Sequence, residues 1–148
     1  KSPAVAKKYL DGSRIPIIDD WFRTEDLGSM DKNGNLSVKG RMKELINRGG
    51  NNTYPEEIES FLLMNQKVKR AAVVGAPDSV YGEKVIAFIV PFEDQSVSDS
   101  EIKDFLKKSL PVYKIPDKII FVDKIPATES GKIYRSKLKS ELVGHHEK

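Results

Sequence analysis

The pair Gly131–Lys132, in the stretch PATESGKIYR, combines two residue types that could handle a phosphate group. A lysine ammonium is a compact charge for phosphate oxygens, and a glycine lacks a Cβ and so lets the backbone approach a ligand closely. The phosphate-binding loop of nucleotide hydrolases needs another glycine five residues before its second glycine. That position holds Pro126, which excludes such a loop. A solvated basic helix start, continued by Arg135, is the alternative interpretation.

Two further stretches carry groups suited to a nucleotide. In WFRTEDLG, Asp26 follows a predicted strand, where its carboxylate could accept two hydrogen bonds from a ribose diol. In GRMKELINRGGNNTYPEEIE, Arg41 and Lys43 precede a glycine pair and a helix start, which gathers cations and backbone amides. Taken singly, the first stretch is also explained as a solvent-facing acidic strand and the second as a connecting loop.

Composition limits the class of protein. A chain of 148 residues with 39% hydrophobic and 32% charged residues fits one ordinary globular domain. The longest apolar runs, such as Val85–Val90, are far shorter than the ~20 residues of a membrane-spanning helix. The absence of cysteine excludes disulfides and thiol chemistry, and we expect a cytoplasmic protein. His145 and His146 stand at the chain end, where we expect no metal site.

A net charge of +3 raises the question of nucleic acid. The basic residues are scattered among 22 acidic ones, and the sequence has no basic strand interleaved with aromatic residues. We therefore expect no nucleic-acid partner and keep a basic nucleic-acid-binding domain as a minor alternative, which a salt series would reveal. The opening KSPAVAKKYL has neither an initiator methionine nor a signal-peptide layout, so we expect a piece of a longer protein.

The elements that must position these groups follow from turn residues and apolar spacing. Residues 20–41 predict two antiparallel strands around Lys32–Gly34. The run Gly49–Asn52 is expected to break regular structure before a helix that starts at Pro55. Residues 70–77 and 84–92 predict strands, the second buried on both faces.

The second half adds two helices and one strand. Residues Gly75–Gly82 are expected to join the two preceding strands. Ser98 and Glu101 form a capping-box pair, which predicts a helix from about 98 to 110. A further strand is expected to stop at Pro126, before a loop and a last helix. The order predicts an α+β fold, a small domain with helices packed on a short β-sheet and preceded by a β-hairpin.

In this order and spacing, the three stretches resemble motifs of the adenylate-forming superfamily, which includes acyl-CoA synthetases, peptide-synthetase adenylation domains and beetle luciferases. WFRTEDLG resembles the aromatic-x-Thr-Gly-Asp-Leu motif, and GRMKELINRGGNNTYPEEIE the motif from Gly-Arg-x-x-(Asp/Glu) to Pro-x-Glu-Ile-Glu. PATESGKIYR resembles Pro-x-Thr-x-x-Gly-Lys-x-x-Arg. The resemblance runs from Lys1 to about Leu142 and is closest to the acyl-CoA ligase branch.

The resemblance implies that residues 1–40 end a large nucleotide- and acid-binding domain and that residues 41–148 are a mobile carboxy-terminal lid. ATP, with Mg²⁺, activates a carboxylic acid as an acyl-adenylate, and the thiol of CoA then takes the acyl group. The implied partners are the chain's own amino-terminal domain, the acid and CoA, and none of the substrates is bound tightly by this stretch. It is expected to be inactive alone, because it lacks most of the nucleotide site and the acid pocket.

The same resemblance assigns roles to single positions. Lys132 is the adenylation lysine, Asp26 holds the ribose hydroxyls, Arg41 lies beside the nucleotide, Lys43 is the hinge, and Gly49 and Gly50 border the pantetheine tunnel. It implies no metal ligand in this stretch.

Two points depart from a simple match. Glu25 stands where the family usually has glycine, and a second carboxylate there would weaken nucleotide binding unless strand alternation turns it to the other face. A carrier-protein-docking module of a peptide-synthetase-like enzyme is the alternative function. Such members tend to carry Gln-Val-Lys-Ile-Arg-Gly where this chain has LINRGG, so the residues of this motif favour a CoA ligase. The sequence does not name the acid, because the large domain sets that specificity.

Overall fold

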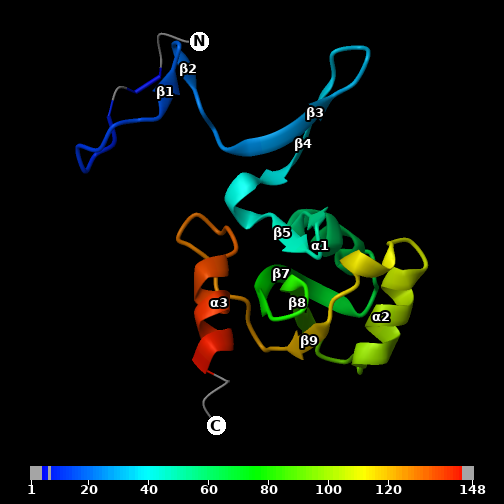
Figure 1. Ribbon diagram of the computed structural model, residues 1–148. Coiled ribbons are helices and arrows are strands. Elements are labelled where there is room, and N and C mark those ends of the chain that lie inside the picture. Colours follow the sequence, from blue (N-terminus) through cyan, green and yellow to red (C-terminus); the bar gives the residue numbers. More distant parts are fainter. Residues whose placement is uncertain (1–4, 7, 145–148) are drawn as a thin grey trace.

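The computed structural model describes residues 5–6 and 8–144, which form a folded body with two β-ribbons projecting from it (Figure 1). His145 and His146, where no metal site was expected, lie outside the described residues. The arrangement is a small α+β domain, as the order of elements predicts.

The two ribbons come first along the chain. β1 (Ile17–Ile18) pairs with β2 (Trp21–Phe22), and β3 (Asp26–Met30) pairs with β4 (Leu36–Arg41), both antiparallel. The hairpin expected over residues 20–41 is confirmed, but it starts only at Asp26. Its expected first residues instead pair backwards with β1, because Asp19–Asp20 turn the chain with positive φ angles of 49° and 62°.

The glycine pair lies in a hairpin of its own. β5 (Ile46–Arg48) pairs with β6 (Asn51–Thr53), and the two-residue turn between them is Gly49–Gly50. Both glycines have positive φ, 58° and 84°, which is the geometry that a type I′ hairpin turn requires and that glycine adopts without strain. The expectation of a break in regular structure was therefore wrong at Asn51–Asn52. The turn residues join two strands instead of ending a strand pattern.

A five-stranded sheet forms the centre of the body. β7 (Val68–Asp78) and β8 (Gly82–Pro91) are antiparallel, and β9 (Lys118–Phe121) runs parallel to β8. The sheet has the order β6-β5-β8-β7, with β9 also paired to β8. The strands run through most of Gly75–Gly82, which was expected to join them. Asp78 closes the short turn that remains, because its carboxylate accepts hydrogen bonds from two backbone amides of the turn, both at 3.0 Å.

Three α-helices and two short 3₁₀ helices complete the described chain. They are η1 (Met42–Glu44), α1 (Pro55–Leu63), α2 (Asp99–Lys107), η2 (Val112–Lys114) and α3 (Arg135–Gly144). α1 starts at Pro55, as predicted. The capping box of α2 is confirmed, since Ser98 Oγ accepts from the Glu101 amide at 3.2 Å and Glu101 Oε2 accepts from the Ser98 amide at 2.9 Å. β9 ends at Phe121, earlier than the expected stop at Pro126.

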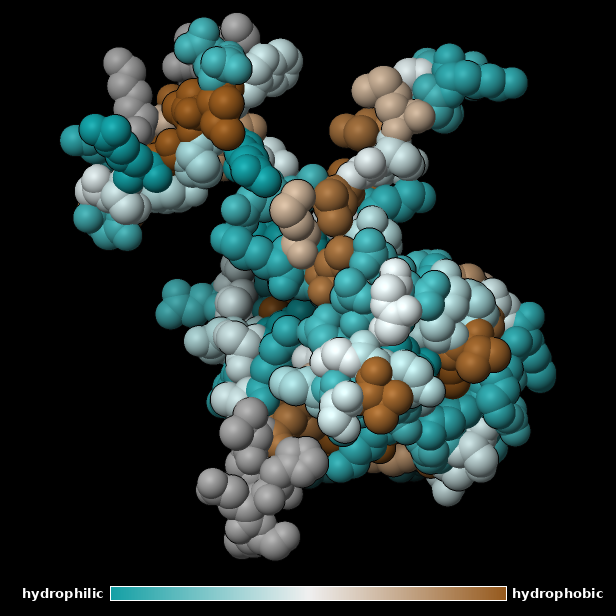
Figure 2. Space-filling model, in the orientation of Figure 1, coloured by the Kyte–Doolittle hydropathy of each residue, from teal (hydrophilic) through white to brown (hydrophobic). Residues whose placement is uncertain are grey.

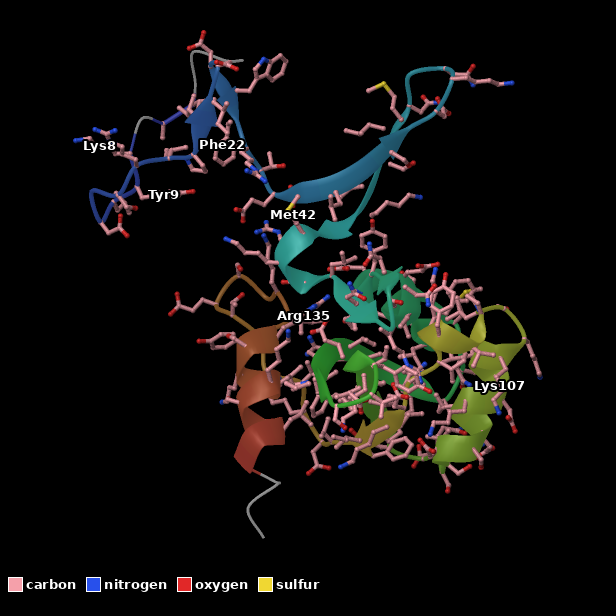
Figure 3. All side chains as sticks on the ribbon, in the orientation of Figure 1. Lys8, Tyr9, Phe22, Met42, Lys107 and Arg135 are labelled. Atoms are coloured by element: carbon pink, nitrogen blue, oxygen red, sulfur yellow. The ribbon has the colours of Figure 1, made fainter. Side chains whose placement is uncertain are left out.

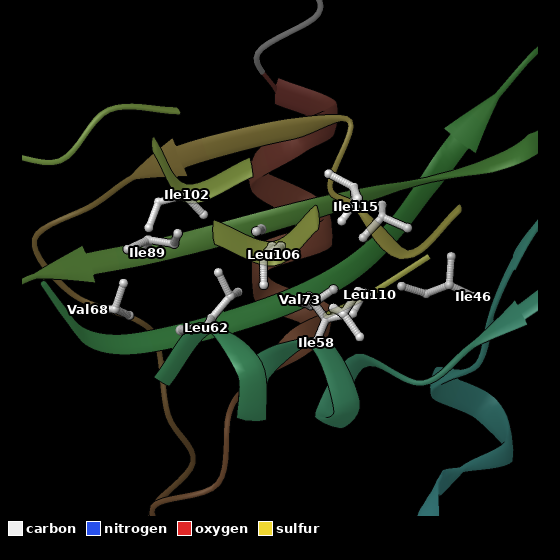
Figure 4. Packing of buried hydrophobic residues seen from close by; sticks show 13 residues of the cluster. Ile46, Ile58, Leu62, Val68, Val73, Ile89, Ile102, Leu106, Leu110 and Ile115 are labelled. Carbon is white, nitrogen blue, oxygen red and sulfur yellow. The ribbon is translucent and has the colours of Figure 1, made fainter. Parts of the chain in front are cut away.

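The sheet separates two apolar cores. Val73 and Ile89 face one core with α1 and α2, where Ile58, Leu62, Ile102 and Leu106 are buried (Figure 4). Their neighbours Val74 and Phe88 face the opposite core, where Leu138 of α3 is buried. Successive side chains of a strand point to opposite faces, so β7 and β8 are apolar on both faces. The expectation that the second strand is buried on both faces is confirmed.

Candidate functional site

The turn that carries Lys132 is closed by its own backbone. Thr128 donates an amide hydrogen bond to the Lys132 carbonyl at 2.8 Å, and its hydroxyl accepts from the Lys132 amide at 3.2 Å. Gly131 completes the turn with a φ of 81°, a conformation that strains other residue types. The Lys132 side chain is exposed and makes no hydrogen bond or ion pair within the described residues. Among the described residues, it is a cation without a partner, carried on a turn closed by hydrogen bonds.

The carboxy-terminal end of this turn is anchored in the body. Ile133 forms an isolated antiparallel bridge with Ala127 and packs against the core that includes Leu138 of α3. Tyr134 donates its amide to the Pro126 carbonyl at 2.9 Å. Arg135 then opens α3 and points inward, below Met42 of η1 (Figure 3). The exposed lysine is therefore three residues from a buried anchor.

Arg135 lies among three carboxylates. Its Nη2 is 3.1 Å from Glu56 Oε1 and 3.1 Å from Glu59 Oε2, and its Nε is 2.9 Å from Glu44 Oε2. The geometry at Nε does not make a hydrogen bond to any described residue, so the approach of Glu44 is a charge contact. We refer to these four residues as the Arg135 cluster.

Burial changes the pKa of two carboxyls of this cluster, Glu59 and Glu44. Desolvation raises the pKa of Glu59, and the guanidinium of Arg135 opposes that shift. Desolvation also raises the pKa of Glu44, with Arg135 again opposing it and the carboxyl of Glu56 adding to it. The cluster thus holds more carboxylates than its one guanidinium balances.

Asp26 and Arg41 meet across the β3–β4 ribbon. The two are register partners, and Arg41 Nε lies 3.2 Å from Asp26 Oδ1. Both side chains are exposed, so water screens the pair. The structure therefore brings together the two residues that the sequence associated with a nucleotide, and it holds them as an open ion pair at the base of the ribbon.

Glu25 has a contact that strand alternation did not predict. It precedes β3, with a positive φ of 61°, and its Oε2 lies 2.7 Å from Lys43 Nζ. The hydrogen bond to Lys43 lowers the pKa of Glu25. A positive φ is a conformation that glycine adopts readily, which explains why a glycine motif fits this backbone. The carboxylate is engaged by the lysine of η1.

The hinge candidate lies next to the lysine turn. Lys43 and Glu44 line a hollow of about 300 Å³ together with Tyr134, Arg135, Ser136 and Lys139. η1 and the start of α3 are therefore neighbours, although they lie far apart in the sequence. Gly49–Gly50 belong instead to the hairpin of β5 and β6.

That hairpin is fixed by Arg48. Its guanidinium pairs with Asp117, donates to the carbonyls of Val112 and Tyr113 at 3.2 Å, and lies 5.2 Å from the ring centroid of Tyr81. The Gly49 amide donates to the Tyr81 carbonyl at 2.8 Å. The glycine turn is thus held against the β7–β8 turn.

Sequence reasoning missed the anchors. Glu44 and Arg135 belong to the quoted motifs, but neither received a role, and Arg48 was read only as part of a loop. The available signal was that Arg135 is a fixed charged position of the motif Pro-x-Thr-x-x-Gly-Lys-x-x-Arg. Its partners Glu56 and Glu59 are distant in sequence and could not be paired with it.

Two general features bear on the class of site. The residues that the structure describes contain no cluster of three or more histidine, cysteine, aspartate or glutamate side chains that could hold a metal ion. Within the same residues, no helix is long and apolar enough to cross a membrane.

Known proteins share both the sequence and the fold. The chain is 42% identical over 138 residues to an oxalate–CoA ligase of Arabidopsis thaliana, covering 91% of this chain and 27% of the relative. It is 39% identical over 142 residues to a 2-succinylbenzoate–CoA ligase of Listeria monocytogenes, covering 94% and 30%. The chain therefore spans about a quarter to a third of the length of these curated relatives.

A solved structure agrees with them. The o-succinylbenzoate CoA synthetase of Bacillus subtilis, in complex with its acyl-adenylate intermediate, matches with a TM-score of 0.79 and 40% identity, over 83% of this chain and 25% of that one. The model of the AMP-binding enzyme C-terminal domain matches residues 57–132, just over half of the chain. On this evidence the chain belongs to the family of AMP-binding enzyme C-terminal domains.

Proposed function

We propose that this chain is the carboxy-terminal part of an ATP-dependent acyl-CoA or aryl-CoA ligase. Residues 1–40 would end the nucleotide- and acid-binding domain, and residues 41–148 would form a lid that moves about Lys43. The observation that carries the proposal is Lys132, an exposed cation without a partner among the described residues, on a turn fixed to the body of a family domain. Its natural counter-charge is a ligand held by another part of the enzyme.

The chemistry of the first step explains the cation. A carboxylate oxygen of the acid attacks the α-phosphorus of ATP, the bond to pyrophosphate breaks, and acyl-adenylate and pyrophosphate form. Negative charge grows on the non-bridging oxygens and on the leaving group, where a preorganised cation is most effective. Lys132 would supply that charge. Mg²⁺ would enter together with ATP as part of the nucleotide substrate.

The remaining residues serve binding and movement in this proposal. Asp26 would hold the ribose hydroxyls, and Arg41, which orients the Asp26 carboxylate through their ion pair, would lie beside the nucleotide. In the second step the sulfur of CoA attacks the acyl carbon and AMP leaves. Gly49 and Gly50 would border the pantetheine tunnel, since their turn presents backbone without side chains.

The exposed apolar side chains of the two ribbons are consistent with a larger protein. Trp21, Met30, Leu36 and Val38 are all more than half exposed, and Figure 2 shows apolar residues gathered over both ribbons. Apolar groups in water favour burial against another surface. We propose that the rest of the nucleotide-binding domain covers them.

The acceptor separates this proposal from its alternative, a carrier-protein-docking adenylation module. Similarity to CoA ligases over more than nine-tenths of the chain favours CoA. The full-length enzyme should transfer acyl groups to free CoA and not to a phosphopantetheinylated carrier protein. Transfer to the carrier alone would establish the alternative.

Lys132→Ala in the full-length enzyme tests the central role. We expect adenylate formation to fall by about 10²–10³-fold, the typical loss of one preorganised charge at a developing anion. Thioester formation from supplied acyl-adenylate and CoA should stay near the wild-type rate. Pyrophosphate release with oxalate, 2-succinylbenzoate, octanoate and benzoate first selects the acid, and a thermal melt checks the fold. Parallel loss in both steps would refute two separate conformations.

A further inference from the structure

Arg135 is a cation in an unusual place. It is the first residue of α3, where the positive end of the helix dipole repels a positive charge, and its side chain is only 10% exposed. Such a position requires strong compensation from neighbouring anions. The three carboxylates of the Arg135 cluster provide it.

The cluster joins four elements of the body. Glu44 belongs to η1, while Glu56 and Glu59 belong to α1. Glu59 also accepts a hydrogen bond from the Val73 amide of β7 at 2.7 Å. Arg135 therefore ties the start of α3 to η1, α1 and, through Glu59, to the central sheet.

Only two residues separate this anchor from Lys132. Ile133 is held by its bridge to Ala127, and Tyr134 by its amide bond to the Pro126 carbonyl. The segment is therefore short and bonded along its length, so a shift of Arg135 would be passed on to the turn that carries the lysine. At the other side, Glu44 directly follows Lys43.

We propose that Arg135 is a positioning residue for adenylation, which fixes the Lys132 turn relative to the segment Met42–Glu44 through the Arg135 cluster. The inference rests on the proposed role of Lys132 in the first half-reaction. Arg135 does not touch the reacting atoms in this scheme. It acts by holding Lys132 where the lid can insert it, and a misplacement of about 1 Å is enough to lower a rate by up to ~10²-fold.

Four forms of the full-length enzyme test the proposal: wild type, Arg135→Lys, Lys132→Ala and the double variant. Arg135→Lys keeps the charge but loses the planar fork that reaches several carboxylates at once. We expect it to lower the kcat of pyrophosphate-releasing adenylation by about 10–10²-fold. Thioester formation from supplied acyl-adenylate and CoA should remain near wild type. In the Lys132→Ala background, Arg135→Lys should cause almost no further loss, since a residue that acts through Lys132 has nothing left to position.

Controls separate positioning from folding. Lys137→Gln removes an exposed charge two residues along the same helix and should leave both half-reactions unchanged. If Arg135→Lys melts early, Glu44→Gln weakens the same cluster from the η1 side and should reproduce the selective loss of adenylation. If the rate loss of the double variant equals the product of the two single losses, Arg135 is merely structural. An equal loss of both half-reactions in Arg135→Lys would show the same. If Lys132→Ala alone leaves adenylation intact, the proposed function fails, and that single result identifies the failure.

Discussion

Two groups of ion pairs meet at the segment Met42–Glu44, and their side chains differ in exposure to water. On the side of the ribbons, Glu25 pairs with Lys43 and Asp26 pairs with Arg41, and these side chains are 35–78% exposed. On the side of the body, Arg135 and Glu59 of the Arg135 cluster are each only 10% exposed, while Glu44 and Glu56 are 33% and 38% exposed. Exposed pairs contribute about 0–1 kcal/mol and re-form easily, whereas breaking a buried pair leaves an uncompensated charge.

The difference in exposure fits the proposal that this domain moves as a lid. Contacts that cross a hinge must be broken and replaced, so they should be weak. Contacts that hold a catalytic group within the moving body should be strong, because the body must travel without changing shape. We infer that rotation about Lys43 would break the Glu25–Lys43 pair and preserve the Arg135 cluster. The Asp26–Arg41 pair lies within the β3–β4 ribbon and would move with it.

The largest expected effect is on the cluster. Arg135→Ala should lower the free energy of unfolding of the 148-residue chain by about 3 kcal/mol at pH 7, because the buried carboxylate of Glu59 loses its counter-charge. Urea unfolding measures this. The exposed control Lys137→Ala should change stability by less than about 0.5 kcal/mol. Similar small effects in both variants would remove the distinction between buried and exposed pairs.

The next largest effect concerns the proposed hinge at Lys43. Lys43→Pro fixes one backbone φ, so in the full-length enzyme one half-reaction should lose far more rate than the other. Lys43→Ala removes the ion pair to Glu25 but leaves the backbone free, and it should have a small and similar effect on both. The two half-reactions are measured separately, as for Lys132→Ala. An equal loss in both with proline would place the hinge elsewhere.

A smaller effect concerns the backbone at Glu25. Its positive φ of 61° is costly for a residue with a Cβ, so Glu25→Gly should be about 1 kcal/mol more stable than Glu25→Ala. Both variants lose the ion pair to Lys43, which cancels in the comparison. Thermal melts of the two variants measure the difference. Equal melting temperatures would mean that the strain is absent.

The smallest expected effects are on how stability depends on pH, and they have opposite signs for Glu59 and Glu25. The pKa of Glu59 is raised by burial, so its contribution to stability is complete below pH 4.5 and is lost as pH rises through the raised pKa. The pKa of Glu25 is lowered by Lys43, so its contribution is present above pH 4.5 and is lost as pH falls through the lowered pKa. Relative to wild type, Glu59→Gln should therefore gain stability as pH rises above 4.5, and Glu25→Gln should gain as pH falls below it. Urea unfolding of both variants and of wild type, measured at about every pH unit from pH 3 to 8, tests the sign of each pH dependence. Slopes of the same sign would contradict the comparison.

Local patterns predicted much of the fold. Pro55 and the Ser98–Glu101 capping box mark helix starts through interactions within one turn, and apolar runs mark β7 and β8. Strand ends were less predictable. β9 stops at Phe121 with no nearby sequence signal, because the end of a strand depends on where its neighbour can still pair with it.

The candidate site also has a part that local sequence patterns predict and a part that only packing decides. Lys132, Asp26, Arg41, Lys43 and the glycine pair were found from residue type and spacing. The sequence alone thus determined the family resemblance and the groups available for chemistry, since motifs are local. The tertiary structure alone decided that Arg135 meets Glu44 and Glu59, and that Glu25 meets Lys43. Charge pairing between distant residues depends on how helices and strands pack, and spacing along the chain carries no record of that packing.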